Sequence, residues 1–230
     1  MTTAPTYERT RARVETYFDR TATRTWERLT SDAPVSGVRA TVRAGRDRMR
    51  AVMMAQLPAD LTGLRVLDAG CGTGAMSVEL ALRGAQVVGV DISPALIEIA
   101  QKRCPANVAG LIDFRAGDMF APALGRFDHI MAMDSMIYYD ASDIAASLGG
   151  LRDRLRGSMI FTLAPRTPLL MAMFRVGKLF PRKDRSPTMI PHSAPRIASA
   201  LRDGSVNGRL REVERVNSGF YISTALEFRP

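Results

Sequence analysis

The chain has 230 residues, and its length and composition exclude several classes of protein. A chain of this length folds as one domain with a small addition at most. Because 46% of the residues are hydrophobic and 24% are charged, the chain is neither disordered, collagen-like nor a coiled coil. Its two cysteines are too few for a disulfide scaffold, and no Cys/His cluster indicates a metal site.

The net charge of +9 is concentrated in two segments. Residues 39–50 carry +4 and residues 166–185 carry +5, while the other 198 residues have equal numbers of basic and acidic side chains. Such segments suit nucleic acid, membrane phosphates or carboxylates, so motifs must decide among these partners. The chain has no apolar run of 18 residues and no signal-peptide core. We therefore expect a reduced, cytoplasmic protein.

The first sixty residues are predicted to be helical. Apolar residues at helical spacing over residues 12–30 predict an amphipathic helix or a broken pair of helices. A second helix is predicted over Arg46–Leu57 and ends before Pro58, because a residue that precedes proline disfavours the helical conformation. Arg46 and Arg50 are expected on its solvated face.

Five short apolar runs then alternate with helical segments. They are Arg65–Ala69, Gln86–Asp91, Leu111–Arg115, Phe127–Met133 and Ser158–Leu163. Alternating strands and helices predict a parallel sheet with helices on both faces.

The alternation pauses for almost thirty proline-rich residues after Leu163 and resumes with a helix over Pro195–Arg202. Two last runs, Leu210–Val216 and Phe220–Phe228, are separated by a short turn that suits an antiparallel hairpin. The predicted fold is a Rossmann-like α/β sheet of seven mostly parallel strands, closed by that hairpin.

The strongest motif is VLDAGCGTG at residues 66–74, between the first predicted strand and a helix over Met76–Leu82. Its glycines let the backbone approach a ligand, and the helix N-terminus offers unpaired N–H groups. The spacing alone leaves the ligand open: Gly70, Gly72 and Ala75 also satisfy a dinucleotide pattern, and Asp91 could hold a ribose hydroxyl of either cofactor.

Three features favour S-adenosylmethionine over a dinucleotide. The Asp68 carboxylate would repel a pyrophosphate but suits the ammonium group of a methionine moiety. Asp118 and Met119 follow the third strand and suit the amino group and ring of adenine. One such nucleotide-binding unit with its closing hairpin also leaves too few residues for a separate domain that binds a hydride acceptor. The pattern resembles the class I methyltransferases, which have the seven-stranded fold predicted above.

This resemblance implies a set of cofactor-binding residues. The methionine end is expected at Asp68, Gly70, Gly72, Gly74 and the Met133 backbone, the ribose at Asp91 beside Ile92, the adenine at Asp118 and Met119, and the cofactor carboxylate at Arg43. S-adenosylhomocysteine would be the product.

Nucleic acid is a minor alternative as substrate. Methyltransferases of this fold that modify amino groups of bases carry a D/N-P-P-F/Y motif after the fourth strand, whereas residues 133–139 here read MDSMIYY. Neither Cys71 nor Cys104 is placed as a nucleophile for base methylation. We therefore expect no nucleic acid partner.

Further segments resemble the magnesium-protoporphyrin IX O-methyltransferases of (bacterio)chlorophyll biosynthesis, a pathway of photosynthesis. They are WERL at 26–29, VRAGR at 42–46, MDSMIYY at 133–139, and LAPRT at 163–167 leading to GKLFP at 177–181 and a histidine. The resemblance runs from about Val14 to the C-terminus. It implies methylation of a propionate carboxylate of Mg-protoporphyrin IX to the monomethyl ester.

Two positions depart from the family pattern. Thr30 and Tyr138 stand where the chlorophyll branch has a tyrosine and a histidine proposed to act on the substrate, so those roles do not transfer. Tyr138, Tyr139 and His192 remain the catalytic candidates.

The chemistry places few demands on side chains, because a propionate with a pKa of about 4.3 is ionised at neutral pH and needs no general base. Orientation of the reactants should account for most of the rate enhancement, by lowering the activation barrier by about 7–11 kcal/mol. Basic and apolar side chains of residues 166–185 suit a flat macrocycle with carboxylates, or an anionic membrane surface. The substrate-binding candidates are Trp26, Arg166, Met173, Arg175, Lys178 and Phe180.

The expected organisation has four parts: a helical arm or lid at 1–57, a cofactor-binding core at 58–164, a substrate-side lid insertion at 165–195, and a helix and hairpin at 196–230. Two alternatives stay open besides RNA: another O-methyltransferase, of quinone or polyketide type, and a cofactor-binding partner of magnesium chelatase. Contact with the porphyrin-binding chelatase subunit and peripheral attachment to the photosynthetic membrane are further expectations.

Overall fold

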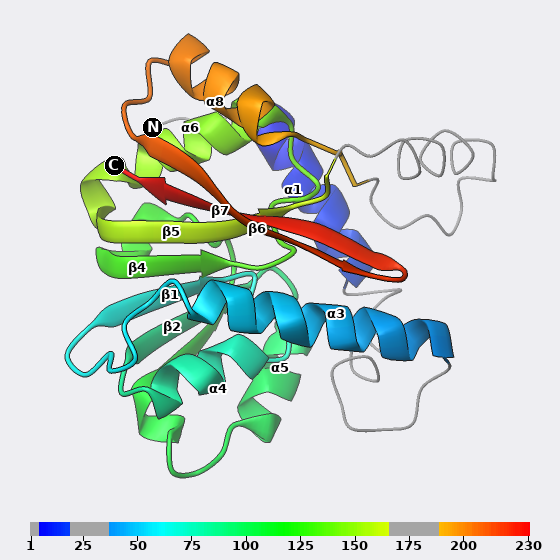
Figure 1. The fold of residues 1–230 in the computed structure, drawn as a ribbon. Helices are drawn as coiled ribbons and strands as arrows, with labels where there is room; N and C mark the ends of the chain where they lie inside the picture. The colour runs from blue at the N-terminus through cyan, green and yellow to red at the C-terminus, as the bar shows by residue number, and fades with distance from the viewer. Residues whose placement is uncertain (1–4, 19–36, 166–188) are drawn as a thin grey trace.

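The computed structural model describes residues 5–18, 37–165 and 189–230. These residues form a seven-stranded sheet with helices on both faces (Figure 1). The strands are β1 (Arg65–Ala69), β2 (Gln86–Asp91), β3 (Ile112–Ala116), β4 (Phe127–Ala132), β5 (Leu155–Leu163), β6 (Arg209–Ser218) and β7 (Tyr221–Arg229). Their order is β3-β2-β1-β4-β5-β7-β6.

The first five strands are parallel, and β7 is antiparallel to both β5 and β6. The predicted fold class is therefore confirmed. The hairpin turn is shorter than the predicted residues 217–219. Ser218 pairs with Tyr221, so the turn consists of Gly219 and Phe220, and Gly219 takes the left-handed conformation (φ +58°). β5 also begins before the predicted Ser158, since Leu155 pairs with Phe127 across an irregularity in register.

The described helices are α1 (Pro5–Tyr17), α3 (Gly37–Met54), α4 (Ala75–Leu82), α5 (Pro94–Arg103), α6 (Ala141–Leu151) and α8 (Ala194–Asp203). Short 3-10 turns occur at η2 (Ala109–Leu111), η3 (Pro122–Leu124) and η4 (Arg152–Arg154). The predicted boundaries at the N-terminal end were wrong. α1 begins at Pro5 and not near residue 12, and α3 runs from Gly37 to Met54 where the sequence predicted residues 46–57.

Two hydrophobic cores lie on opposite faces of the sheet. Met131 and Ile160 pack on the face covered by α3 and α4, whereas their strand neighbours Ile130 and Phe161 pack on the face covered by α6 and α8 (Figure 1). Alternate residues of a strand point to opposite faces, so a strand buried on both sides is apolar throughout. α3 lies within the segment predicted as an arm, yet it contributes Met49 and Met53 to the first core.

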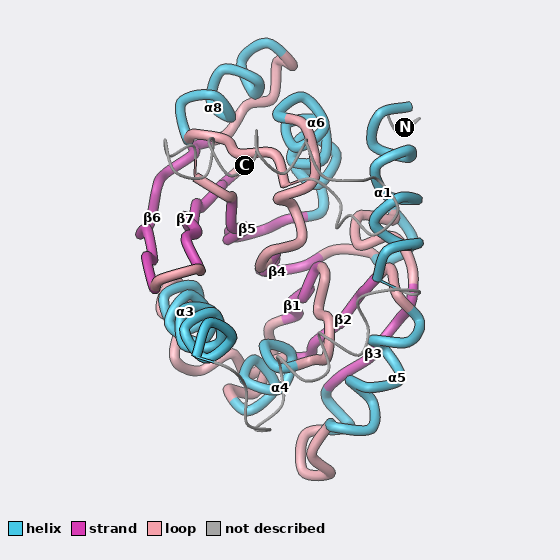
Figure 2. Tube along the Cα trace, turned by 90° about the vertical axis from the view of Figure 1, so that its right-hand side faces the viewer, coloured by secondary structure: helices cyan, strands magenta, loops and turns pink. Residues whose placement is uncertain are grey.

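The parallel strands all end at the same edge of the sheet, which Figure 2 views face on. The strand order reverses direction at β1, which lies between β2 and β4, and ligands of open α/β sheets bind at such a point. α1 lies at this edge (Figure 2), where Thr6 donates a hydrogen bond to Asp143 and Tyr7 donates one to Asp118. Over the described residues, no helix combines the length and the apolar character needed to span a membrane.

Candidate active site

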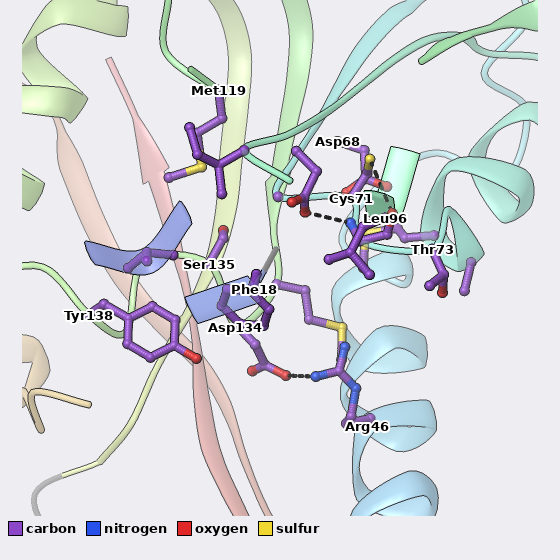
Figure 3. A pocket seen from close by; sticks show the side chains of 18 of the residues that line it. Phe18, Arg46, Asp68, Cys71, Thr73, Leu96, Met119, Asp134, Ser135 and Tyr138 are labelled. Atoms are coloured by element: carbon purple, nitrogen blue, oxygen red, sulfur yellow. Dashed lines mark hydrogen bonds and ion pairs between the residues drawn. The ribbon is translucent and has the colours of Figure 1, made fainter. Parts of the chain in front are cut away.

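A cavity of about 320 Å³ opens at the carboxyl ends of β1, β2, β3 and β4. Its walls come from α1, α3 and the loops that follow these four strands (Figure 3). The predicted cofactor residues that line it are Arg43, Asp68, Gly70, Gly72, Asp91, Ile92, Asp118, Met119 and Met133. The topology therefore brings nearly all of the predicted cofactor residues to one cavity.

The glycine loop after β1 is shaped by close contacts with its neighbours. Gly70 has φ +85°, and a Cβ there would lie 2.3 Å from the Cβ of Ser135 in the loop after β4. Gly72 has φ +55° and borders the cavity, where a Cβ would meet no atom within 4 Å. Gly70 thus serves contact between two loops, while Gly72 leaves space beside the cavity.

Gly74 has a different surrounding, although it belongs to the same motif. It is the N-cap of α4, and a Cβ there would lie 2.9 Å from the Phe114 ring and 3.1 Å from Ala100. It is not among the residues that line the cavity. Packing therefore accounts for this glycine, and its contact with a cofactor stays a prediction.

Asp68 is a buried carboxylate beside the glycine loop. The Ser77 hydroxyl donates a hydrogen bond to its Oδ2 (2.6 Å). Burial, with Asp91 nearby, raises the pKa of Asp68 to about 7. A cationic group in the cavity would favour the ionised form of this carboxylate, as the predicted methionine ammonium requires.

Asp91, at the end of β2, has both carboxylate oxygens held by backbone groups. Gly72 N–H donates to Oδ2 (2.8 Å) and Ser93 N–H donates to Oδ1 (3.0 Å). The residue predicted to hold the ribose therefore also fixes the glycine loop against β2. Burial raises the pKa of the Cys71 thiol in this loop well above its usual value, which makes it a poor nucleophile.

Asp118 contacts α1, which the sequence analysis did not foresee. Tyr7 donates to its Oδ1 (2.8 Å), and Arg11 forms an ion pair with its Oδ2 (3.0 Å). The Tyr7 ring also stacks on Tyr139, with 4.9 Å between ring centroids. The carboxylate predicted to bind adenine thus also holds α1 across the cavity.

Residues of α1, together with Phe18 directly after it, line the cavity along one face. They are Tyr7, Arg11, Val14 and Phe18. Their spacing of three and four residues is the signal that could have identified this face. Tyr7 and Arg11 were not predicted, because they precede residue 12, where the predicted helix began.

A face of α3 forms another wall, lined by Arg43, Arg46, Asp47 and Arg50. The expected solvated face for Arg46 and Arg50 was wrong, because both side chains line the cavity and only 19% and 20% of their surface is exposed. Arg50 is bound by Glu79 and Asp47, and Arg46 pairs with Asp134 (2.6 Å). Arg43 lines the cavity, as expected for a residue that meets the cofactor carboxylate.

The loop after β4 brings Tyr138 and Tyr139 to the cavity. Figure 3 shows the Tyr138 hydroxyl directed into it on the side of Asp134. Burial raises the pKa of both tyrosines, so their hydroxyls stay protonated at neutral pH. Phe18 packs edge-on against Tyr138, with 6.3 Å between ring centroids.

His192 lies behind this loop. It is buried, donates from Nε2 to the carbonyl oxygen of Tyr139 (2.9 Å), and its backbone N–H donates to Ala164. It does not line the cavity, so the geometry gives it a contact with Tyr139 and not with a ligand. Its catalytic role stays a prediction.

The predicted substrate-binding residues lie outside the described residues, as does Thr30. They are Trp26, Arg166, Met173, Arg175, Lys178 and Phe180. Within residues 5–18, 37–165 and 189–230, no three His, Cys, Asp or Glu side chains gather where they could hold a metal ion.

Comparisons with known proteins give the chemical context of this cavity. A family model described as magnesium-protoporphyrin IX methyltransferase C-terminus matches residues 132–230, and a methyltransferase domain model matches residues 66–157. The chain is 56% identical to the magnesium-protoporphyrin O-methyltransferase of Rhodobacter capsulatus, over 97% of this chain and 98% of the relative.

Two further comparisons differ in how much of this chain they cover. The crystal structure of magnesium protoporphyrin IX methyltransferase from Synechocystis PCC 6803 with bound SAH superposes with a TM-score of 0.77, at 30% identity, over 94% of this chain and 98% of that one. A ubiquinone biosynthesis O-methyltransferase from Azorhizobium caulinodans is 37% identical, but over only 51% of this chain and 47% of the relative.

Proposed function

The chain belongs to the family of magnesium-protoporphyrin O-methyltransferases, and we propose that it transfers the methyl group of S-adenosylmethionine to a propionate carboxylate of Mg-protoporphyrin IX. The products are the monomethyl ester and S-adenosylhomocysteine. The observation that carries this proposal is similarity to a magnesium-protoporphyrin O-methyltransferase over 97% of the chain, with a cavity at the carboxyl ends of the strands.

The residues of the cavity fit S-adenosylmethionine. Asp68 offers a buried carboxylate to the methionine ammonium, and Arg43 offers a guanidinium to the methionine carboxylate. Gly72 leaves space where a side chain would narrow the cavity. Asp91 is oriented by backbone N–H groups toward a ribose, and Met119 supplies an apolar wall for adenine.

Bound S-adenosylmethionine supplies an electrophilic methyl group. The protein must orient a carboxylate that is already ionised and keep water out. Phe18, Val14 and Met119 give the cavity an apolar lining that excludes water. Because burial raises the pKa of Tyr138, its hydroxyl is a hydrogen-bond donor at neutral pH and not a general base. This suits a residue that positions the reacting propionate.

Quinone methylation is the weaker candidate. The ubiquinone relative matches only about half of this chain, whereas the porphyrin relative matches 97% of it. The segment that carries the predicted porphyrin contacts, residues 166–185, lies outside the described residues. Attachment to the photosynthetic membrane is proposed for the same basic segment, and contact with magnesium chelatase is proposed for the chain without a particular segment.

A competition assay tests the substrate. The protein is incubated with methyl-labelled S-adenosylmethionine and a mixture of Mg-protoporphyrin IX, metal-free protoporphyrin, a catechol and RNA. We expect label in the Mg-porphyrin, released by mild base as an ester would be. Label in the catechol or in RNA without label in the porphyrin would refute the proposal.

A further inference from the structure

Asp134 has a backbone conformation that is uncommon for residues other than glycine. Its φ is +56°, and among the described residues the other non-glycine residue with positive φ is Ser205, in the turn after α8. A side chain in the left-handed region is retained where surrounding contacts fix it, and such positions cluster at functional sites. Asp134 lines the cavity, while Ser205 does not.

Three elements fix Asp134. From β5, the Thr162 hydroxyl accepts from the Asp134 N–H (2.7 Å) and donates to Oδ1 (3.1 Å). From β7, the Tyr221 hydroxyl donates to Oδ1 (3.0 Å). From α3, Arg46 forms an ion pair with Oδ2 (2.6 Å), as Figure 3 shows. One carboxylate therefore joins the loop after β4 to two strands and a helix.

Gly45 makes part of this arrangement possible. A Cβ at Gly45 would lie 2.7 Å from the Cβ of Tyr221, so only glycine lets the tyrosine lie against α3 with its hydroxyl at Asp134. The glycine and the second arginine of the VRAGR motif thus serve the same carboxylate. This contact crosses 87 residues of sequence between Asp134 and Tyr221.

Asp134 lies in the loop that joins the predicted cofactor residue Met133 to Tyr138. It follows Met133, on the predicted cofactor side, and precedes Ser135, whose hydroxyl donates to the Ala69 carbonyl of β1 (2.7 Å). The same loop continues to Tyr138, whose pKa the Asp134 carboxylate helps to raise. Asp134 and Tyr138 therefore belong to one loop that lines the cavity.

We propose that Asp134 is a positioning residue for methyl transfer, which fixes the loop 133–139 so that Tyr138 faces the methyl donor. Arg46, Thr162 and Tyr221 hold Asp134 in this conformation. The inference rests on the proposed function, because it concerns the orientation of the propionate. It gives the Arg46 and Tyr221 side chains a role in the reaction through their contacts with Asp134.

The test compares Asp134→Asn with a matched control. Asn keeps the shape of Asp134 but loses the charge that binds Arg46. The control, Glu214→Gln, removes the exposed pair Arg48–Glu214 (3.1 Å), which also joins α3 to the hairpin but lies outside the cavity. The kcat of each protein on Mg-protoporphyrin IX is divided by the concentration of cofactor-binding sites measured by calorimetry, so that unfolded protein does not count.

We expect Asp134→Asn to lower kcat at least tenfold while the Kd of S-adenosylhomocysteine changes less than threefold, and Glu214→Gln to leave both unchanged. Arg46→Gln should lower kcat similarly, and the double variant should be no worse than Asp134→Asn alone, because both changes break one interaction. If Asp134→Asn does not fold, Tyr221→Phe decides, since it keeps the ring against Gly45 and should still lower kcat about threefold or more.

Wild-type kcat in Asp134→Asn, or in Tyr221→Phe where Asp134→Asn does not fold, would overturn the inference while the wild type remains active on the porphyrin. A cofactor Kd that rises as much as kcat falls would also overturn it, because the carboxylate would then serve cofactor binding. A wild-type protein that leaves Mg-protoporphyrin IX unmethylated would overturn the proposed function, and the inference with it. The outcomes therefore separate the two claims.

Discussion

The Asp68 carboxylate has a pKa of about 7, which makes cofactor binding sensitive to pH. Below that pKa the carboxyl group is neutral and attracts an ammonium group weakly, and above it the carboxylate is ionised. The affinity for S-adenosylhomocysteine should therefore fall as the pH falls through about 7, and binding below that pH should release a proton.

Calorimetry in buffers of different ionisation enthalpy measures this proton release. Asp68→Asn should weaken binding about tenfold or more, since a hydrogen bond to a charged group contributes roughly 1.5–3 kcal/mol, and should abolish the pH dependence. An affinity that is constant across the same pH range in the wild type would contradict the assignment of Asp68 to the ammonium group.

Gly70 and Gly72 differ in what surrounds them, so alanine should affect them differently. Gly70→Ala would place a methyl group against Ser135, which should destabilise the fold by roughly 1–3 kcal/mol in addition to the left-handed strain of about 1–2 kcal/mol. Gly72→Ala has open space, so it should cost only the left-handed strain of about 1–2 kcal/mol but lower cofactor affinity at least tenfold. Urea unfolding and calorimetry separate these effects, and equal affinity of Gly72→Ala and wild type would refute the cavity role of Gly72.

The sequence was sufficient to predict those site residues that lie in loops directly after strands. The glycines of residues 70–74 and the carboxylates after β1, β2 and β3 were predictable, because a loop at a strand end has a recognisable sequence. The contacts of Asp134 with Thr162 and Tyr221 were not predictable, since they join residues that the sheet brings together from distant parts of the chain.

Among the elements, α1 is held in place by contacts with a carboxylate that lines the cavity. Tyr7 and Arg11 hold it to Asp118, and it crosses the edge where the cavity opens (Figure 2). Replacing both, in Tyr7→Phe with Arg11→Gln, should loosen α1 and raise the dissociation rate of the cofactor about tenfold. Stopped-flow fluorescence would measure this rate, and an unchanged rate would show that α1 does not retain the cofactor.

Element boundaries were least predictable where apolar periodicity was weak. The first turns of α1 and α3 are rich in Arg and Thr, so their apolar spacing begins only some residues into each helix. β1 and β2 were predicted to the residue because they are buried between helices on both faces, so that most of their residues are apolar.

For the whole molecule, the charge of +9 has a different meaning from the one that composition suggests. In the segment 39–50, three arginines pair with acidic groups: Arg46 with Asp134, Arg48 with Glu214, and Arg50 with Asp47 and Glu79. These pairs join α3 to the cavity wall, to β6 and to α4. Arg46 and Arg50 of the first basic cluster thus belong to the cavity wall, whereas Arg48 lies outside it. The second cluster, at 166–185, is the one proposed to meet porphyrin carboxylates.

The mass of the porphyrin after a single incubation with purified protein and S-adenosylmethionine tests the proposed reaction directly. We expect Mg-protoporphyrin IX to gain one methyl group as a base-labile ester, and Asp68→Asn to reduce this product greatly at limiting cofactor. Mg-protoporphyrin IX recovered without an added methyl group, from a protein that binds S-adenosylhomocysteine normally, would contradict the proposed reaction.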